Sequence, residues 1–177
     1  LLLEETGGLE ESRREFAALY ETAVSEPGSL RRAAVAAQHL DRFQEANTLF
    51  KKAVANDPSK VDTLNAWGFL FLQKYDAANA ASTFEDAQKV NPNHPETLLG
   101  LALCSQEAHD GRPKQWAERS LAVNPNLEPA RLLLARQALF SEDYGEAQAQ
   151  IAHCLAVNPN SLGALTLKAV LHSARGE

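Results

Sequence analysis

Residues 64–92 read LNAWGFLFLQKYDAANAASTFEDAQKVNP and carry the pattern that decides the fold. Apolar residues recur at helical spacing on both sides of Lys74-Tyr75-Asp76, with no proline inside either half. This pattern predicts one helix over residues 62–74, a short break, and a second helix over residues 78–90. The second helix should stop at Asn91-Pro92, because a residue that precedes proline is disfavoured in the α region.

The Asn-Pro pair that closes this stretch recurs along the chain at a nearly constant interval. Asn-Pro-Asn occupies residues 91–93, 124–126 and 158–160, and Asn-Asp-Pro occupies residues 56–58. The four prolines are therefore 34, 33 and 34 residues apart. A period near 34 is too long for a coiled-coil heptad and too short for a domain, and it is typical of stacked helix–turn–helix units.

Each interval holds two helical patterns separated by a polar break. A further amphipathic pattern, from Leu9 to Ser25, precedes the first unit. Besides the two helices above and this leading helix, the patterns predict helices over residues 30–39, 43–55, 96–109, 113–123, 129–140, 144–157 and 163–175.

These helix pairs resemble the tetratricopeptide repeat family. The first helix of that motif reads Trp-x2-Leu-Gly-x2-Tyr, and residues 64–71 give Leu64-x2-Trp67-Gly68-x2-Phe71. The second helix of the motif reads Ala-x3-Phe-x2-Ala-x4-Pro. Three units of this chain follow it, with Ala46, Phe50, Ala53 and Pro58, with Ala80, Phe84, Ala87 and Pro92, and with Ala147, Ile151, Cys154 and Pro159.

The resemblance implies an all-α fold, a right-handed superhelical solenoid of stacked helix–turn–helix repeats. Each pair would bury its apolar face against its neighbours. The third unit is one residue short and has Pro113 where the others have Ala, so its second helix should begin there and be short. We divide the chain into a loop or leftover segment (1–8), a leading helix (9–26), repeats at 27–60, 61–94, 95–127 and 128–161, and the first helix of a truncated fifth repeat (162–177).

Composition excludes several classes of protein. The chain has 177 residues, 45% apolar and 23% charged, which is typical of a folded globular protein. Its net charge of −6 argues against nucleic-acid binding, which needs a basic face, and it has no apolar run long enough for a membrane span. The absence of Met and the incomplete fifth unit lead us to expect that the natural chain extends past both ends.

No catalytic or ligand-binding motif stands out. The sequence has no phosphate-binding glycine loop, no nucleophile elbow and no His-Glu-x-x-His. No two histidines lie three or four residues apart on a helix, and His94 is expected to be solvated in a turn between repeats. Cys104 and Cys154 form no Cys-x-x-Cys pair and should be buried thiols. We therefore predict a chain that is not an enzyme and holds no metal or cofactor.

The resemblance also implies a concave face lined by the first helices. Counting from the third residue after each proline, positions 2, 5, 9 and 12 of a first helix usually point into that groove. The lining would be mostly apolar, and we expect it to bind a peptide or helix of a partner protein, with Gln38, Asn65 and Gln106 bonding its backbone. The predicted lining residues are Arg31, Val35, Gln38, Asn65, Phe69, Leu72, Leu99, Leu103, Gln106, Leu132, Arg136 and Leu139.

Other interpretations stay open at this point. Some of these residues could simply pack against the next helix, or flanking helices could fill the groove. The array could be the accessory region of a longer peptidase-like or transferase enzyme whose catalytic domain lies elsewhere. It could also be a self-assembly module in which the open fifth repeat stacks on a second copy. The partner and the compartment are not determined, although unpaired cysteines fit a reducing compartment such as the cytoplasm.

Overall fold

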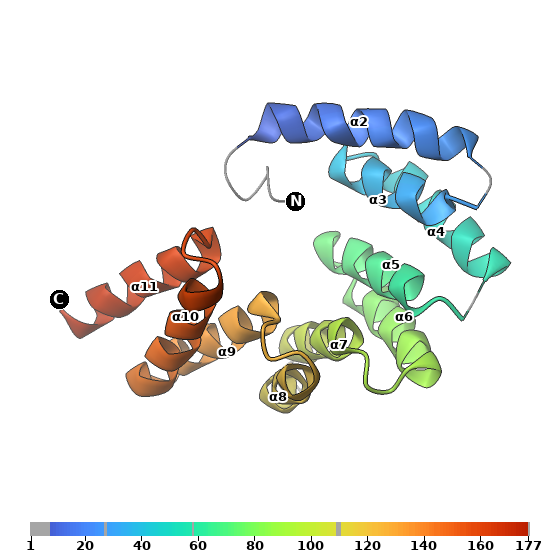
Figure 1. Ribbon diagram of the computed structural model, residues 1–177. Helices are drawn as coiled ribbons and strands as arrows, with labels where there is room; N and C mark the ends of the chain where they lie inside the picture. The colour runs from blue at the N-terminus through green and yellow to red at the C-terminus, as the bar shows by residue number, and fades with distance from the viewer. Residues whose placement is uncertain (1–7, 27, 58, 109–110, 177) are drawn as a thin grey trace.

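The computed structural model describes residues 8–26, 28–57, 59–108 and 111–176, and all regular elements in these ranges are α-helices arranged as a curved array (Figure 1). Of the predicted loop at residues 1–8, only Gly8 lies inside the described residues. The helices lie where the sequence patterns predict them, to within two residues at each end. They are α2 (Leu9–Ser25), α3 (Leu30–His39), α4 (Phe43–Asn56), α5 (Val61–Gln73), α6 (Ala77–Val90), α7 (Pro95–Glu107), α8 (Pro113–Val123), α9 (Glu128–Phe140), α10 (Tyr144–Val157) and α11 (Leu162–Arg175).

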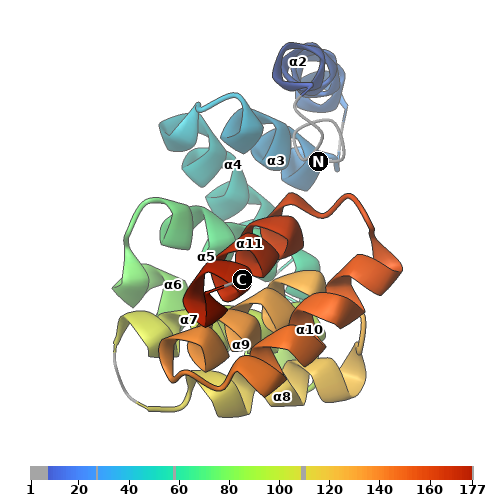
Figure 2. The same ribbon diagram turned by 90° about the vertical axis from the view of Figure 1, so that its left-hand side faces the viewer.

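The helices form the predicted all-α, right-handed superhelical solenoid. Each first helix packs most extensively against its own second helix, in the pairs α3–α4, α5–α6, α7–α8 and α9–α10. Helix α2 packs on α3 at one end of the array, and α10 and α11 form the other end (Figure 2). In the part of the chain that is described, no helix is both long and apolar enough to cross a membrane.

The Asn-Pro-Asn tripeptides form one repeated turn. In each of them the side-chain oxygen of the first Asn accepts a hydrogen bond of 3.1 Å from the backbone N–H of the third residue. This Asx turn changes the direction of the backbone at the point where proline prevents the helix from continuing. At the last turn Ser161 adds a helix cap, because its hydroxyl accepts the N–H of Ala164.

In three of the four repeats a large side chain from the second helix fills the space between two first helices. Phe84 of α6 is completely buried, and its ring lies between Gly68 of α5 and Gly100 of α7. A Cβ built on Gly68 would lie 2.7 Å from Phe84 Cζ, and one built on Gly100 would lie even closer to the same ring. Both glycines are therefore required because the ring occupies the space of a methyl group on either side. Phe50 and Ile151 occupy the corresponding positions in the first and fourth repeats.

The third repeat departs from the others as the sequence predicts. Helix α8 begins at Pro113 and has 11 residues, whereas α4, α6 and α10 each have 14. Ala117 replaces the large side chain and is completely buried. The missing residues are those of the first turn, which begins with an aromatic residue in α4 and α10.

Candidate functional site

The twelve residues predicted to line the concave face fall into three groups by exposure. Arg31, Gln106 and Arg136 are exposed, whereas Asn65 and Leu99 are buried, with 0% and 3% of their surfaces accessible. The remaining members are half-buried; they are Val35, Gln38, Phe69, Leu72, Leu103, Leu132 and Leu139.

Asn65 does not present its amide to the concave face. Its Oδ1 accepts a hydrogen bond of 2.7 Å from the hydroxyl of Thr97, and its Nδ2 lies 3.0 Å from His94 Nδ1. His94 Nε2 in turn lies 3.5 Å from Asp62. The expectation that Asn65 bonds a partner's backbone is therefore wrong, and so is the expectation of a solvated His94, because the two side chains join the second repeat to the third.

Most of the half-buried apolar residues also belong to the core. Phe69 meets the Phe84 ring edge-on at a centroid distance of 5.1 Å, and the backbone of Gly163 lies against Leu132. Leu99 packs so closely that it offers almost no accessible surface to a partner. Others extend the buried clusters of their own junctions, namely Val35, Leu72, Leu103 and Leu139. The interpretation that some of these residues pack against the next helix thus holds for part of the set.

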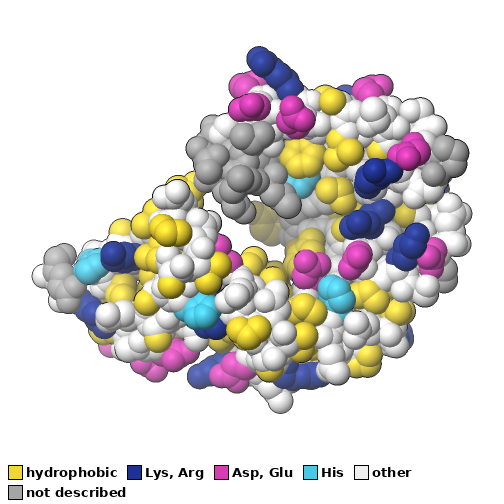
Figure 3. Space-filling view, viewed as in Figure 1, with side chains coloured by type: hydrophobic (Ala, Val, Ile, Leu, Met, Phe, Trp, Pro, Cys, Tyr) yellow, Lys and Arg dark blue, Asp and Glu magenta, His cyan; other side chains and the backbone are white. Residues whose placement is uncertain are grey.

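Pockets lie between successive first helices, one at the N-terminal ends of α3 and α5 and two at the C-terminal ends of α5, α7 and α9. Figure 3 shows a hollow on the inner side of the curve with hydrophobic side chains on its walls. Arg31 lines a pocket of about 410 Å³ between α3 and α5, and Leu72 with Leu103 lines one of about 150 Å³ between α5 and α7. Gln106 and Arg136 line the largest of these, about 580 Å³, between α7 and α9.

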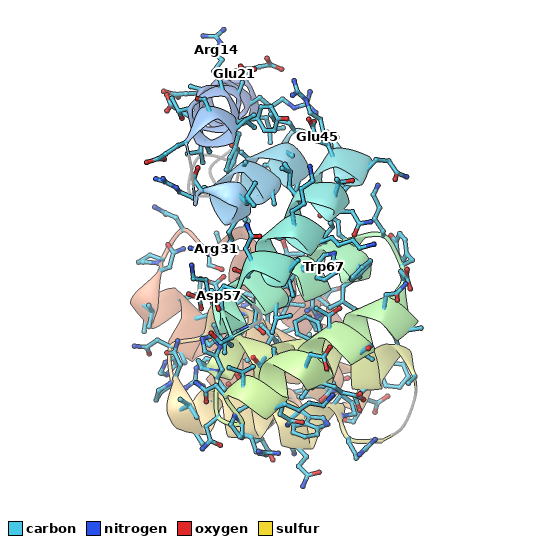
Figure 4. The ribbon with its side chains drawn as sticks, turned by 90° about the vertical axis from the view of Figure 1, so that its right-hand side faces the viewer. Arg14, Glu21, Arg31, Glu45, Asp57 and Trp67 are labelled. Carbon is cyan, nitrogen blue, oxygen red and sulfur yellow. The ribbon has the colours of Figure 1, made fainter. Side chains whose placement is uncertain are left out.

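The α3–α5 pocket is cationic but its charges are mostly paired. Arg32 forms an ion pair with Glu26, and Lys60 Nζ lies 3.5 Å from Asp57. Arg31 has no such partner among the described residues, and it lies on the same side of this junction as Asp57, away from Trp67 (Figure 4). Within the described part of this pocket, Arg31 is thus the basic side chain that is available to a ligand.

Two residues at the α7–α9 pocket were not predicted from the sequence. Phe140 is 94% exposed, and Gln137 has a buried Oε1 with no hydrogen-bond partner among the described residues. The residues that correspond to Phe140 in the two preceding repeats are Gln73 and Glu107. The sequence could have indicated Phe140, because it is an aromatic residue at a position that is polar in the two preceding repeats.

Comparison with known proteins identifies the fold. No protein-family model matches the sequence, and no curated protein matches it significantly. Among solved structures, a thermophilic TPR protein from Thermus thermophilus is 21% identical, with a TM-score of 0.76 over 99% of this chain and 95% of that one. PilW, a type IV pilus biogenesis factor, is 23% identical, with a TM-score of 0.73 over 98% of this chain and 82% of that one. YrrB, a TPR protein with an unusual peptide-binding site, is 17% identical, with a TM-score of 0.61 over 95% of this chain and 87% of that one. This chain has the tetratricopeptide-repeat fold.

Reactive groups are sparse on this tetratricopeptide-repeat array. Among the residues that the structure describes, no three His, Cys, Asp or Glu side chains come together as metal ligands. Cys104 and Cys154 are buried free thiols, and burial raises the pKa of both, to about 11 for Cys104. A thiol with such a pKa stays protonated and unreactive near neutral pH.

Proposed function

We propose that this chain is a non-catalytic interaction module that binds a segment of a partner protein along its concave face. The observation that carries the proposal is a row of pockets between successive first helices, which runs from the N-terminal ends of α3 and α5 to the C-terminal ends of α7 and α9. Accessible polar or charged side chains lie beside the pockets at both ends of the row, Arg31 at the first and Gln106 with Arg136 at the last. Pockets in series beside donor groups suit an extended segment, which offers side chains and backbone carbonyls at regular intervals.

Likeness to other proteins of this fold supports the proposal. YrrB is described as having an unusual peptide-binding site, and PilW as a factor in pilus biogenesis. This chain spans most of the length of both proteins. We infer the same general type of activity, recognition of another polypeptide, and not the same partner.

The test compares the concave face with the outer face. Peptides are selected from a phage-displayed random library on the immobilised wild-type chain, and their affinities are measured by fluorescence anisotropy. The concave variant carries Arg31→Ala, Gln106→Ala and Arg136→Ala. The matched control removes two cations and one amide from the outer helices, with Lys51→Ala, Lys52→Ala and Gln115→Ala.

All six substituted residues are exposed, so neither variant should lose its fold. Loss of a charge-assisted hydrogen bond costs about 1.5–3 kcal/mol, so Kd should rise about tenfold or more in the concave variant. The control should stay near the wild-type affinity. Equal losses in the two variants, or none in either, would show that the concave face is not the binding surface.

A second candidate function is self-association through α11. Leu162, Leu165 and Val170 of this helix are exposed, at 56%, 42% and 48% of their surfaces. Large exposed apolar side chains on one helix favour burial against another chain. Light scattering over a range of concentrations should show a mass that rises above 19.3 kDa if this candidate is right. A constant monomer mass would rule it out.

A further inference from the structure

The pocket between α7 and α9 has a counterpart between α5 and α7, and the two differ greatly. Leu72, Leu103 and Glu107 line the smaller pocket, and Gln106, Arg136 and Phe140 line the larger one. The volume increases from about 150 to about 580 Å³ between these two junctions. The larger value is within the range of about 300–1,000 Å³ that is usual for ligand pockets.

The larger pocket lies where α8 lacks its first turn. The second helices of the first and fourth repeats begin with an aromatic residue, Phe43 and Tyr144. A cation from the next first helix or its end covers each ring, with Lys74 Nζ 3.1 Å from the centre of Phe43 and Arg175 Cζ 5.9 Å from the centre of Tyr144. Because α8 begins only at Pro113, it brings no aromatic ring of this kind to the junction. Helix α6 begins with Ala77 and brings none to the smaller pocket either, but there the first turn of the helix is present and Ala77 lines the pocket.

Three groups at the pocket lack a partner among the described residues. Phe140 exposes 94% of its surface, although nothing in the local packing requires an apolar side chain there. Arg136 is exposed and has no ion-pair partner in the described part of the chain. Gln137 Oε1 is buried without a hydrogen-bond donor among the described residues, and such an atom costs about 1–3 kcal/mol until a donor reaches it.

We propose that this pocket binds an internal partner segment in which an aromatic residue is followed by an acidic one. The partner's ring takes the place of the missing aromatic and packs against Phe140, as aromatic pairs favour. The acidic side chain pairs with Arg136. This inference rests on the proposed function, since it assigns a sequence preference to one end of the proposed binding surface.

The charge of the pocket decides between partner classes. Among the described residues that line the pocket, Arg136 is the charged one, and a basic segment would meet it with repulsion. An aromatic residue followed by lysine should therefore bind more weakly than the same residue followed by aspartate. A segment with alanine in place of the aromatic residue, still followed by aspartate, should lose the contact with Phe140 but keep the charge pair.

The experiment uses the whole chain and short peptides of defined sequence. The probe is N-acetyl-Gly-Phe-Asp-Gly-amide, with Lys in place of Asp and Ala in place of Phe as comparison peptides. Each is titrated to about 10 mM into the ¹⁵N-labelled protein, a range that detects the millimolar affinity expected of a tetrapeptide. The expected result is shifts concentrated at the signals of Gln106, Arg136, Gln137 and Phe140, with weaker binding of both comparison peptides.

Two pairs of matched variants separate the site from the rest of the surface. Phe140→Ala is compared with Tyr75→Ala, because both rings are 94% exposed, and Arg136→Gln with Arg14→Gln, because both arginines are exposed and unpaired among the described residues. The first variant of each pair should raise the Kd of the Phe-Asp peptide about fivefold or more, and the second should leave this Kd unchanged. Circular dichroism confirms that each variant is folded.

Several outcomes overturn the proposal. Equal binding of the Asp and Lys peptides, shifts at other junctions, or no binding at all would each do so. If the library peptides still bind the concave face while the Phe-Asp peptide does not, this pocket assignment fails alone. If the Phe-Asp peptide binds here while the library peptides bind the concave variant as well as the wild type, the pocket stands and the wider proposed function fails.

Discussion

Gly100→Ala tests whether Phe84 is held as tightly as the structure shows. Gly100 lies inside α7, and helix propensity alone predicts that alanine there stabilises the chain by about 1 kcal/mol. Packing predicts the opposite sign. A Cβ at this position would lie 2.5 Å from Phe84 Cδ1 and closer still to two other ring atoms, which is far inside van der Waals contact.

The ring is also closely packed on the side that faces away from Gly100. A Cβ at Gly68 on its other side would already be 2.7 Å from Phe84 Cζ, so the space there is filled too. Forcing an extra methyl group into such a core costs about 1–3 kcal/mol, and this contact belongs at the upper end of that range. After the gain in helix propensity is subtracted, Gly100→Ala should lower the free energy of unfolding by about 1–2 kcal/mol.

Urea unfolding followed by far-UV circular dichroism measures this change, and Trp67 and Trp116 report the second and third repeats by fluorescence. Gly145→Ala is the matched control, because its Cβ would meet only Asp143 Oδ1, at 3.6 Å, and it should be neutral or stabilising. The double variant Gly100→Ala with Phe84→Leu should lose less free energy of unfolding than the sum of the losses in the two single variants. The smaller Leu side chain leaves room for the added methyl group. A Gly100→Ala chain as stable as the wild type, with an unchanged urea dependence, would show that the packing argument is wrong.

Three further changes are expected to move stability in stated directions. Tyr75 has φ of +58° and is 94% exposed, so Tyr75→Asn should raise the free energy of unfolding by about 0.5–1 kcal/mol, measured by urea unfolding. Asn65→Ala leaves the buried Thr97 hydroxyl without its acceptor and should cost about 1–3 kcal/mol; a smaller loss in Asn65→Ala with Thr97→Val than the single losses add up to would confirm the coupling. The pKa of Cys104 is raised by burial from 9.0 to about 11, so its stabilising contribution is complete below pH 9 and is lost as pH rises towards 11. Stability should therefore fall more steeply over this interval in the wild type than in Cys104→Ala, and parallel curves would contradict the assignment.

Sequence periodicity predicted the helices well because the signal is local. The spacing of apolar residues and the Asn-Pro steps depend on neighbours within one or two turns, and the observed bounds follow them closely. The short α8 was predicted for the same reason, since Pro113 alone determines where that helix can begin.

The concave lining was harder to predict because it depends on contacts between repeats. Position 5 of the first helix is exposed as Arg31 in the first repeat, but buried as Asn65 in the second and Leu99 in the third. The difference comes from the neighbouring helix, which brings Thr97 and His94 against Asn65. The sequence pattern of a single repeat does not include contacts with the next repeat. It therefore cannot show that position 5 is accessible at one end of the array and buried in the core at its middle.

The irregular third repeat connects stability to the proposed pocket. Helix α8 is shorter than the other second helices, with 11 residues against 14, yet α7 has eight buried residues against five in α5 and five in α9. The larger number of buried residues along α7 therefore compensates for the shorter α8. The pocket lies beside α7, which has the most buried residues of the described first helices. A pocket on such a wall is already in place before a ligand arrives, which lowers the ordering cost of binding. Gly100 lies in this same wall, so a strained Gly100→Ala chain should bind the Phe-Asp peptide more weakly even though Gly100 does not line the pocket.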